Sequence, residues 1–208
     1  MRSKKTQYMS FMAMFLAIEV ILVLTPIGYL RIGPIDATIM HIPVIIAGIA
    51  LGKKAGAQMG FVFGLTSMLN ATFRPGLTSF CFTPFISIGT ISGNWTSLLI
   101  AFVPRILLGY FAGLVYEQLQ KRKVNENASM IAGALTGAIT NTVLVLGGIY
   151  VFFGQPYAEA VGVAYQTLVA VLLGVVTSNG IMEAVLAAII TVVVCRAIKP
   201  ITRKFEKQ

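Results

Sequence analysis

The chain has 208 residues, of which 57% are hydrophobic and only 11% are charged, and its mean hydropathy is +0.85. These values exclude a soluble domain and indicate a protein that lies in the lipid bilayer. Several apolar runs approach the roughly 20 residues that cross a bilayer as a helix, and no series of short alternating strands indicates a barrel. The net charge of +9 does not predict a nucleic-acid partner, because the cations cluster between the apolar runs.

The apolar runs predict an all-α integral membrane protein in which residues 1–208 form a single membrane domain. Six spans are expected, at about 8–25, 39–51, 55–69, 97–116, 128–153 and 179–198. Residues 70–95 are rich in Pro, Gly, Ser and Thr, and we expect a loop with short helical pieces there. Residues 154–178 separate the last two spans and are apolar enough for a helix lying in the membrane or for a seventh crossing.

The positions of lysine and arginine predict the orientation, because positive charge is retained in the cytoplasm. With six spans, most of the 16 cations fall on one side, in clusters of three, two, three and five. The clusters are the amino terminus, the Lys53–Lys54 turn, the turn at 121–123 and the tail from Arg196. Both termini are therefore expected in the cytoplasm. We reject seven spans, since the basic tail would then lie outside.

Glycines recur at four-residue steps and predict close helix packing. We expect this packing to lie within the chain rather than against another subunit. The glycines are Gly52, Gly56, Gly60 and Gly64, with the pairs Gly109/Gly113 and Gly133/Gly137.

Motifs for metal, nucleotide or catalytic chemistry are missing from the sequence. Cys81 and Cys195 fit neither a disulfide framework nor a metal-binding spacing, so free thiols and no metal or other cofactor are expected. The stretch "GIALGKK" lacks the spacing of a phosphate-binding loop, so the chain is not expected to use ATP itself. No HExxH, GxSxG or paired catalytic carboxylates occur, and we do not expect an enzyme.

Three ionisable residues lie well inside predicted spans: Glu19, Arg105 and Glu183. Each costs at least about 2.5 kcal/mol at the centre of the bilayer unless it is paired or hydrated. Pro104 cannot donate to the carbonyl of Ile100, and such helix breaks occur where they line a cavity. A guanidinium suits a carboxylate or phosphate, so Arg105 predicts an anionic ligand. The alternative is that Arg105 pairs with Glu183 or Glu19 and only ties two helices together.

Further polar residues fall at the outer ends of the last three spans. Asn141 and Thr142 reach about the depth of Arg105, which lies roughly 12 Å of helix below Ser97, and Asn179 caps or enters the sixth span. Together with Glu183 they predict a polar cluster that opens outward. Trp95 is expected to be an interfacial anchor, and His41 is expected to hydrogen-bond at a helix terminus rather than to bind metal.

Two stretches carry a resemblance to a known family. They are "IGPIDATIMHIPVIIAGIALGKKAGAQMGFVFGLTS" at 32–67 and "LTSFCFTPFIS" at 77–87, and "AMFLA" adds the AxxxA spacing of Ala13 and Ala17. Over essentially its whole length, the chain resembles the substrate-binding (S) component of an energy-coupling factor (ECF) vitamin transporter. It is most similar to the group that handles pantothenate.

The resemblance implies a six-span S-component bundle in a bacterial plasma membrane and a mechanism. An S component binds its vitamin in an outward-facing cavity that is closed by the loops after spans one and three. It then docks on a transmembrane T component with two ATPases and topples to carry the site inward. The resemblance implies that Ala13 and Ala17 form the docking face for the T component.

For pantothenate, Arg105 is the expected partner of the carboxylate, and other polar side chains are expected at its hydroxyls and amide. These candidates, taken from depth and chemistry, are Asn141, Asn179, Glu183, Thr38 and Thr78. The alternative ligands are riboflavin and pyridoxine or hydroxymethylpyrimidine. Two other classes stay open: a membrane-embedded enzyme using Glu183 or Glu19, and a structural membrane subunit.

Overall fold

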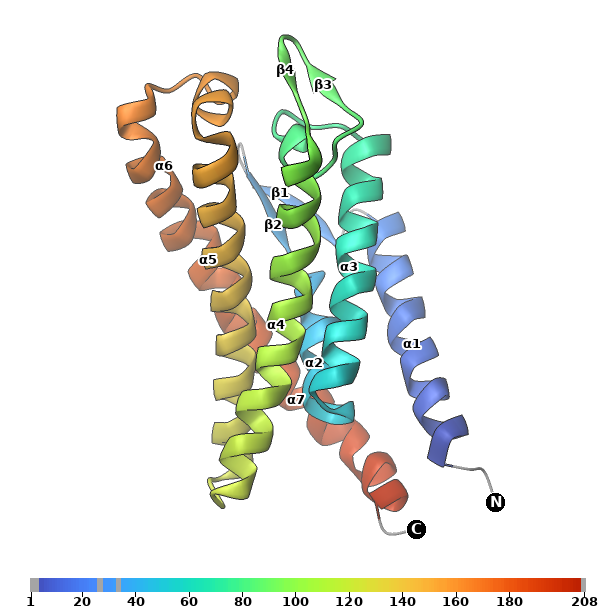
Figure 1. Ribbon diagram of the computed structural model, residues 1–208. Coiled ribbons are helices and arrows are strands. Elements are labelled where there is room, and N and C mark those ends of the chain that lie inside the picture. The colour runs from blue at the N-terminus through green and yellow to red at the C-terminus, as the bar shows by residue number, and fades with distance from the viewer. Residues whose placement is uncertain (1–3, 26–27, 33–34, 207–208) are drawn as a thin grey trace.

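A computed structural model describes residues 4–25, 28–32 and 35–206, most of which are helical (Figure 1). The helices are α1 (Lys4–Leu24), α2 (His41–Leu51), α3 (Lys53–Phe73), α4 (Trp95–Lys121), α5 (Glu126–Ala160), α6 (Leu168–Val175) and α7 (Ile181–Glu206). A π turn at Val176–Gly180 joins α6 to α7, and short 3-10 turns lie at Ser79–Cys81 and Tyr165–Thr167.

Among the described residues, four helical runs are long and apolar enough to cross a membrane. These runs are Lys5–Leu24, Trp95–Lys121, Glu126–Ala160 and Tyr165–Ile201. The helix α3 has 21 residues but is less apolar, and α2 has only 11 residues, about 16 Å of helix. The helical membrane bundle is confirmed, whereas six complete crossings stay a prediction.

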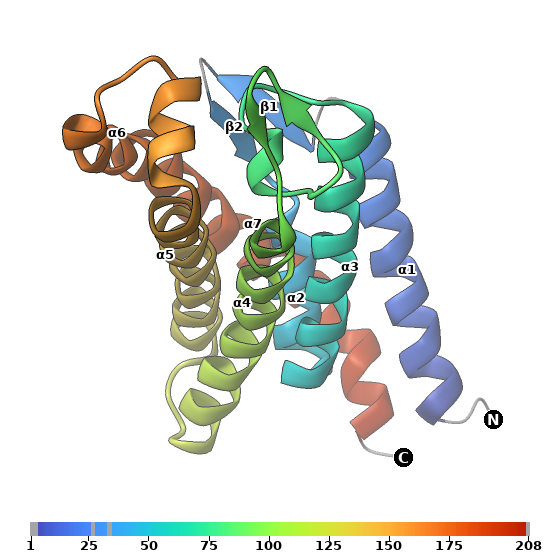
Figure 2. The same cartoon turned by 45° about the horizontal axis from the view of Figure 1, so that its top comes forward.

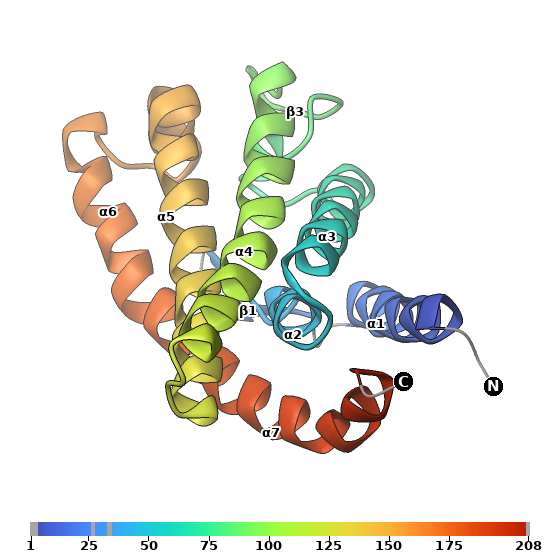
Figure 3. The ribbon, with the colours of Figure 1, turned by 60° about the horizontal axis from the view of Figure 1, so that its bottom comes forward.

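The helix α2 forms the centre of the bundle. It is buried from His41 to Ile49, and it contacts α1, α3, α4, α5 and α7. Figure 3 shows it surrounded by these helices. A helix that is apolar on all sides needs this environment, so the shortest predicted span becomes the core rather than a lipid-facing helix.

The glycine stripes pack α3 and α2 against α4, as expected. A Cβ added at Gly60 would lie 2.0 Å from the carbonyl oxygen of Arg105. Cβ atoms added at Gly56 and Gly109 would each lie within 2.3 Å of the other glycine's carbonyl oxygen. The backbones therefore touch, and the prediction of packing within the chain is confirmed.

The basic clusters share one end of the molecule. The start of α1, the end of α7 and the α2–α3 and α4–α5 turns all lie at the lower end of Figure 1. There Lys53 pairs with Glu117 at 3.1 Å, and Lys199 pairs with Glu126. This arrangement agrees with the predicted clustering, and its cytoplasmic location stays a prediction.

Two small hairpins at the opposite end correct the purely helical expectation (Figure 2). They are β1 (Tyr29–Ile32) with β2 (Ile35–Thr38), and β3 (Ser87–Ile88) with β4 (Ile91–Ser92), both antiparallel. Strands of two or four residues are too short for their alternation to stand out in a sequence. These strands lie in the two connections that were expected to be loops.

The connection between the last two long helices is also more helical than expected. The helix α5 continues to Ala160, with a kink at Phe153 that lies three residues before Pro156. The next helical run begins at Tyr165, so most of residues 154–178 belongs to two long helices.

Candidate functional site

The site is centred on Arg105 in the first half of α4, where this residue is 5% exposed. Its Nη1 donates a hydrogen bond of 2.5 Å to the carbonyl of Ile100. This is the carbonyl that Pro104 leaves without a helical donor. The guanidinium also lies over two aromatic rings, 5.4 Å from the centre of Phe63 and 5.1 Å from that of Phe82. The cation is thus held by its own helix, by α3 and by the loop that follows α3.

The packing of α4 against α5 brings Asn141 to the level of Arg105. The two helices are antiparallel, with Gly148 against Ile100 and Gly137 against Ala112. Arg105 lies between these two contacts, at the level of the turn that contains Asn141. The Asn141 side chain is 7% exposed, and its Oδ1 has no hydrogen-bond partner among the described residues. A buried amide oxygen of this kind is an acceptor that suits a ligand.

Asn179 reaches the same region from the π turn between α6 and α7. It is 7% exposed, and a Cβ on the next residue, Gly180, would lie 3.4 Å from Thr142 of α5. The π turn therefore packs against the turn of α5 that carries Asn141. Single π turns inside helices are frequent at functional sites, because they redirect a side chain.

Glu183, in the first turn of α7, connects the β1–β2 hairpin to the bundle. Its Oε1 accepts the backbone N–H of Thr38 at 2.6 Å, across 145 residues of sequence. The Thr38 hydroxyl donates to the Gly28 carbonyl at 3.1 Å and accepts the Met40 N–H at 3.1 Å. Arg105 also acts electrostatically on the Glu183 carboxylate. The Glu183 carboxylate therefore lies close to both Arg105 and Thr38, the last residue of β2.

The long loop after α3 covers the same region. It is tied to α4 by Ser97, whose Oγ donates to the Phe80 carbonyl at 2.7 Å and accepts the Asn94 N–H at 3.1 Å. Phe82, two residues after Phe80, then reaches Arg105. Thr78 lies at the beginning of this segment, where its carbonyl accepts the Cys81 N–H. The structure thus places Thr78 in the covering loop rather than beside the guanidinium.

Glu19 and His41 are buried outside this network of hydrogen bonds. Glu19 is fully buried on α1, and neither carboxylate oxygen has a hydrogen-bond partner in the described part of the chain. A hydrogen-bonded tie between Arg105 and Glu19 is therefore not formed. The ring of His41 lies beside the backbone of Thr38 and Glu183. Neither ring nitrogen has a hydrogen-bond partner of standard geometry among the described residues, so the expected hydrogen-bonding role of His41 stays a prediction.

The polar residues proposed from the sequence stay a prediction, and no aromatic residue is proposed beside them. Phe63 and Phe82, which lie against Arg105, are not among the candidates. The signal that was available is the pair of aromatic segments "GFVFG" and "SFCFTPF", which both precede the helix that carries Arg105. Within the described residues, no three His, Cys, Asp or Glu side chains gather as a metal site.

Comparison with known proteins identifies the family. The family model for the substrate-specific component of ECF transporters matches residues 7–195. The chain belongs to this family. It is therefore a multi-pass bacterial membrane protein and a substrate-specific vitamin-uptake component, and not an enzyme.

Two curated relatives align with this S component over nearly their whole length. The pantothenic acid transporter PanT of Lactococcus lactis subsp. cremoris is 36% identical over 201 residues, covering 95% of this chain and 96% of that protein. The pantothenate transporter PanT of Leuconostoc mesenteroides subsp. mesenteroides is 29% identical over 211 residues, covering 98% of each. The membrane-enzyme and structural-subunit alternatives find no support in these relatives.

Proposed function

We propose that this S component captures pantothenate at the end of the molecule that carries the two hairpins. The observation that carries the proposal is the buried guanidinium of Arg105, level with the amide of Asn141, in a chain whose full-length relatives are named pantothenate transporters. We further propose that it delivers the vitamin inward by docking on a T component with two ATPases, as its family membership implies.

The chemistry of pantothenate fits the groups at this site. The molecule has a carboxylate, hydroxyls and an amide. A guanidinium forks onto a carboxylate, and the rings of Phe63 and Phe82, centred 5.4 and 5.1 Å from the guanidinium carbon, limit the positions open to that fork. The amides of Asn141 and Asn179 offer donors and acceptors to the vitamin amide and hydroxyls. Glu183 uses Oε1 for Thr38, and its other oxygen can accept a vitamin hydroxyl.

The covering segments couple binding to closure in this proposal. The hairpin β1–β2 is fastened to Glu183 through Thr38, and the loop after α3 contacts Arg105 through Phe82. Each of these two covering segments therefore contacts an ionisable residue of the site. A ligand that neutralises Arg105 and hydrogen-bonds to Glu183 stabilises the closed positions of the hairpin and of the loop. We therefore expect slow dissociation of the ligand.

The docking face proposed for the T component is the outer surface of α1. Ala13 and Ala17 are both exposed and lie one turn apart, opposite the buried Phe15 and Glu19. Small residues at this spacing permit another helix to approach closely in lipid. The supporting observation is that Ala13 and Ala17 face outward, whereas Gly56, Gly60, Gly64, Gly109 and Gly113 pack against helices of the same bundle.

Ligand binding to the purified full-length protein tests the proposal. We expect saturable one-to-one binding of pantothenate without ATP in titration calorimetry, and no comparable binding of riboflavin or pyridoxine. Arg105→Ala should abolish binding, while Arg74→Ala, at an exposed arginine near the same end, should leave it unchanged. Tight binding of riboflavin in place of pantothenate, or equal behaviour of the two variants, would contradict the proposed site.

A further inference from the structure

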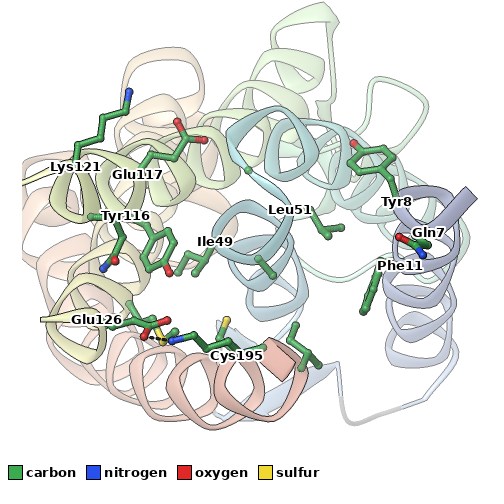
Figure 4. A pocket seen from close by; sticks show the side chains of 16 residues that line it. Gln7, Tyr8, Phe11, Ile49, Leu51, Tyr116, Glu117, Lys121, Glu126 and Cys195 are labelled. Atoms are coloured by element: carbon green, nitrogen blue, oxygen red, sulfur yellow. Dashed lines mark hydrogen bonds and ion pairs between the residues drawn. The ribbon is translucent and has the colours of Figure 1, made fainter. Parts of the chain in front are cut away.

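A cavity lies at the basic end of the molecule, opposite the hairpins. It has a volume of about 770 Å³ and is lined by α1, α2, α4, α5 and α7 (Figure 4). Phe11 and Tyr8 face it from α1, Ile49 and Leu51 from α2, and Cys195 from α7. This cavity is separated from the vitamin site by the buried length of α2, so it has a different occupant or none.

One wall of the cavity is apolar and its rim is polar. The wall is formed by Phe11, Ile49, Met130, Cys195 and Ile198, and the rim carries Lys121 and Lys199. The Nε2 of Gln120, which also lines the cavity, is buried without a hydrogen-bond partner among the described residues. The lining therefore combines apolar surface with buried and charged donors.

The charges of the lining favour an anion. Both acidic residues are already paired, Glu117 with Lys53 at 3.1 Å and Glu126 with Lys199. Lys121 is the remaining cation of the lining. The surrounding end adds the exposed cations Lys5, Lys54, Arg122, Lys123 and Arg196. With its acids neutralised, this end presents a positive potential to whatever enters the cavity.

The cavity also separates α1 from α7. The helix α1 packs on α2 and α3, and α7 packs on α5 and α2. Gln7, Tyr8 and Phe11 of α1 therefore face Cys195 and Ile198 of α7 across the hollow rather than across a packed interface. An occupant between these two helices meets apolar side chains and charged groups together, which suits an amphipathic molecule.

We propose that this cavity binds an anionic phospholipid, with its phosphate at Lys121 and Gln120 and an acyl chain along the wall of Ile49, Met130 and Ile198. Basic pockets between membrane helices are suited to such headgroups. The inference does not depend on which vitamin the outer site binds.

Native mass spectrometry of the full-length protein, delipidated in detergent, tests the inference. The probes are dioleoyl phosphatidylglycerol and dioleoyl phosphatidylcholine at equal concentration. We expect the anionic lipid to be retained about tenfold more strongly, and Lys121→Gln to weaken its retention about fivefold, the effect of one lysine near a lipid surface. The matched control Lys54→Gln removes an exposed cation outside the cavity and should leave retention unchanged.

A second variant tests the apolar wall. Ile198→Trp fills the hollow and should reduce retention of both lipids, while vitamin binding at the far end confirms that the variant is folded. Equal retention of the two lipids, or equal loss in Lys121→Gln and Lys54→Gln, would overturn the proposal. So would cross-linking from Cys195 to a T component with no lipid retained, since the cavity would then be a protein docking surface.

Discussion

The guanidinium of Arg105 donates to the carbonyl of Ile100, the acceptor that Pro104 removes from the hydrogen-bond ladder of α4. The proline and the arginine that follows it therefore form one unit. The proline exposes a carbonyl inside the membrane, and the arginine one residue later satisfies it while keeping its charge buried. An arginine that looks costly in an apolar span thus has a structural partner, and the proposed vitamin is a second one.

This relationship predicts a thermodynamic coupling between Pro104 and Arg105. Arg105→Ala leaves the Ile100 carbonyl without a donor and should lower the free energy of unfolding by about 1–3 kcal/mol. In a Pro104→Ala background, the restored N–H bonds that carbonyl, so the same change should cost less. Thermal unfolding of the four proteins in one detergent measures the coupling. An equal loss of unfolding free energy from Arg105→Ala in both backgrounds would show that the Arg105–Ile100 hydrogen bond contributes nothing.

The Glu183–Thr38 bond predicts a difference between two substitutions of Glu183. Glu183→Ala removes the acceptor of the Thr38 N–H and should release the hairpin β1–β2. Pantothenate should then dissociate about tenfold faster or more, consistent with the loss of a charge-assisted hydrogen bond. Glu183→Gln keeps an acceptor oxygen and should lose less. Dissociation of radiolabelled vitamin measures the rate for each variant. Identical rates would argue against a role of Glu183 in holding the hairpin closed.

The glycine contacts predict that an alanine substitution destabilises the protein at one glycine and not at another. Gly60→Ala places a methyl group 2.0 Å from the Arg105 carbonyl oxygen and should destabilise the protein by about 1–3 kcal/mol. Gly147→Ala, in α5 with no atom within 4 Å, should be neutral or stabilising by about 0.5–1 kcal/mol. Melting temperatures in detergent compare them. Equal melting temperatures of the two variants would contradict the close approach of α3 and α4.

The exposed alanines of α1 predict a separation of binding from transport. Ala17→Trp should leave pantothenate affinity unchanged in purified protein and abolish uptake in cells that supply the T component and ATPases. Ile139→Trp enlarges a residue that is 57% exposed on α5, and uptake should survive it. Counts of accumulated vitamin, normalised to the amount of protein in the membrane, give the comparison. Normal uptake with Ala17→Trp would place the docking face elsewhere.

The buried thiol of the covering loop predicts slow chemical labelling. Cys81 is fully buried, and burial raises the pKa of its thiol, so little reactive thiolate is present at neutral pH. In a Cys195→Ala protein, maleimide should react with Cys81 at least about 100-fold more slowly than with an added thiol at Ser92→Cys on the exposed β4 strand. Pantothenate should slow it further by holding the loop closed. Rapid labelling in the presence of vitamin would contradict that closure.

Several features of the fold were predictable because they depend on local composition. Polar groups are costly in hydrocarbon, so long apolar runs predict the membrane helices. Clusters of lysine and arginine predict which turns share one end of the molecule. The glycine spacing correctly predicted packing within the chain, since four-residue steps place glycines on one helix face. Hairpins of two and four residues per strand and the extension of α5 to Ala160 were not predictable, because tertiary contacts rather than periodicity support them.

By itself the sequence determined that this is a helical membrane protein, that Arg105, Glu19 and Glu183 lie in apolar helices, and that Pro104 frees a carbonyl beside the arginine. These follow from residue type and spacing, which act within a few residues. Only the tertiary structure decided which of these groups meet. Helix packing brings Glu183 to Thr38 across 145 residues of sequence, sets Phe63 and Phe82 around Arg105 and leaves Glu19 apart. Those contacts depend on the directions in which packed helices cross, and no short stretch of sequence encodes them.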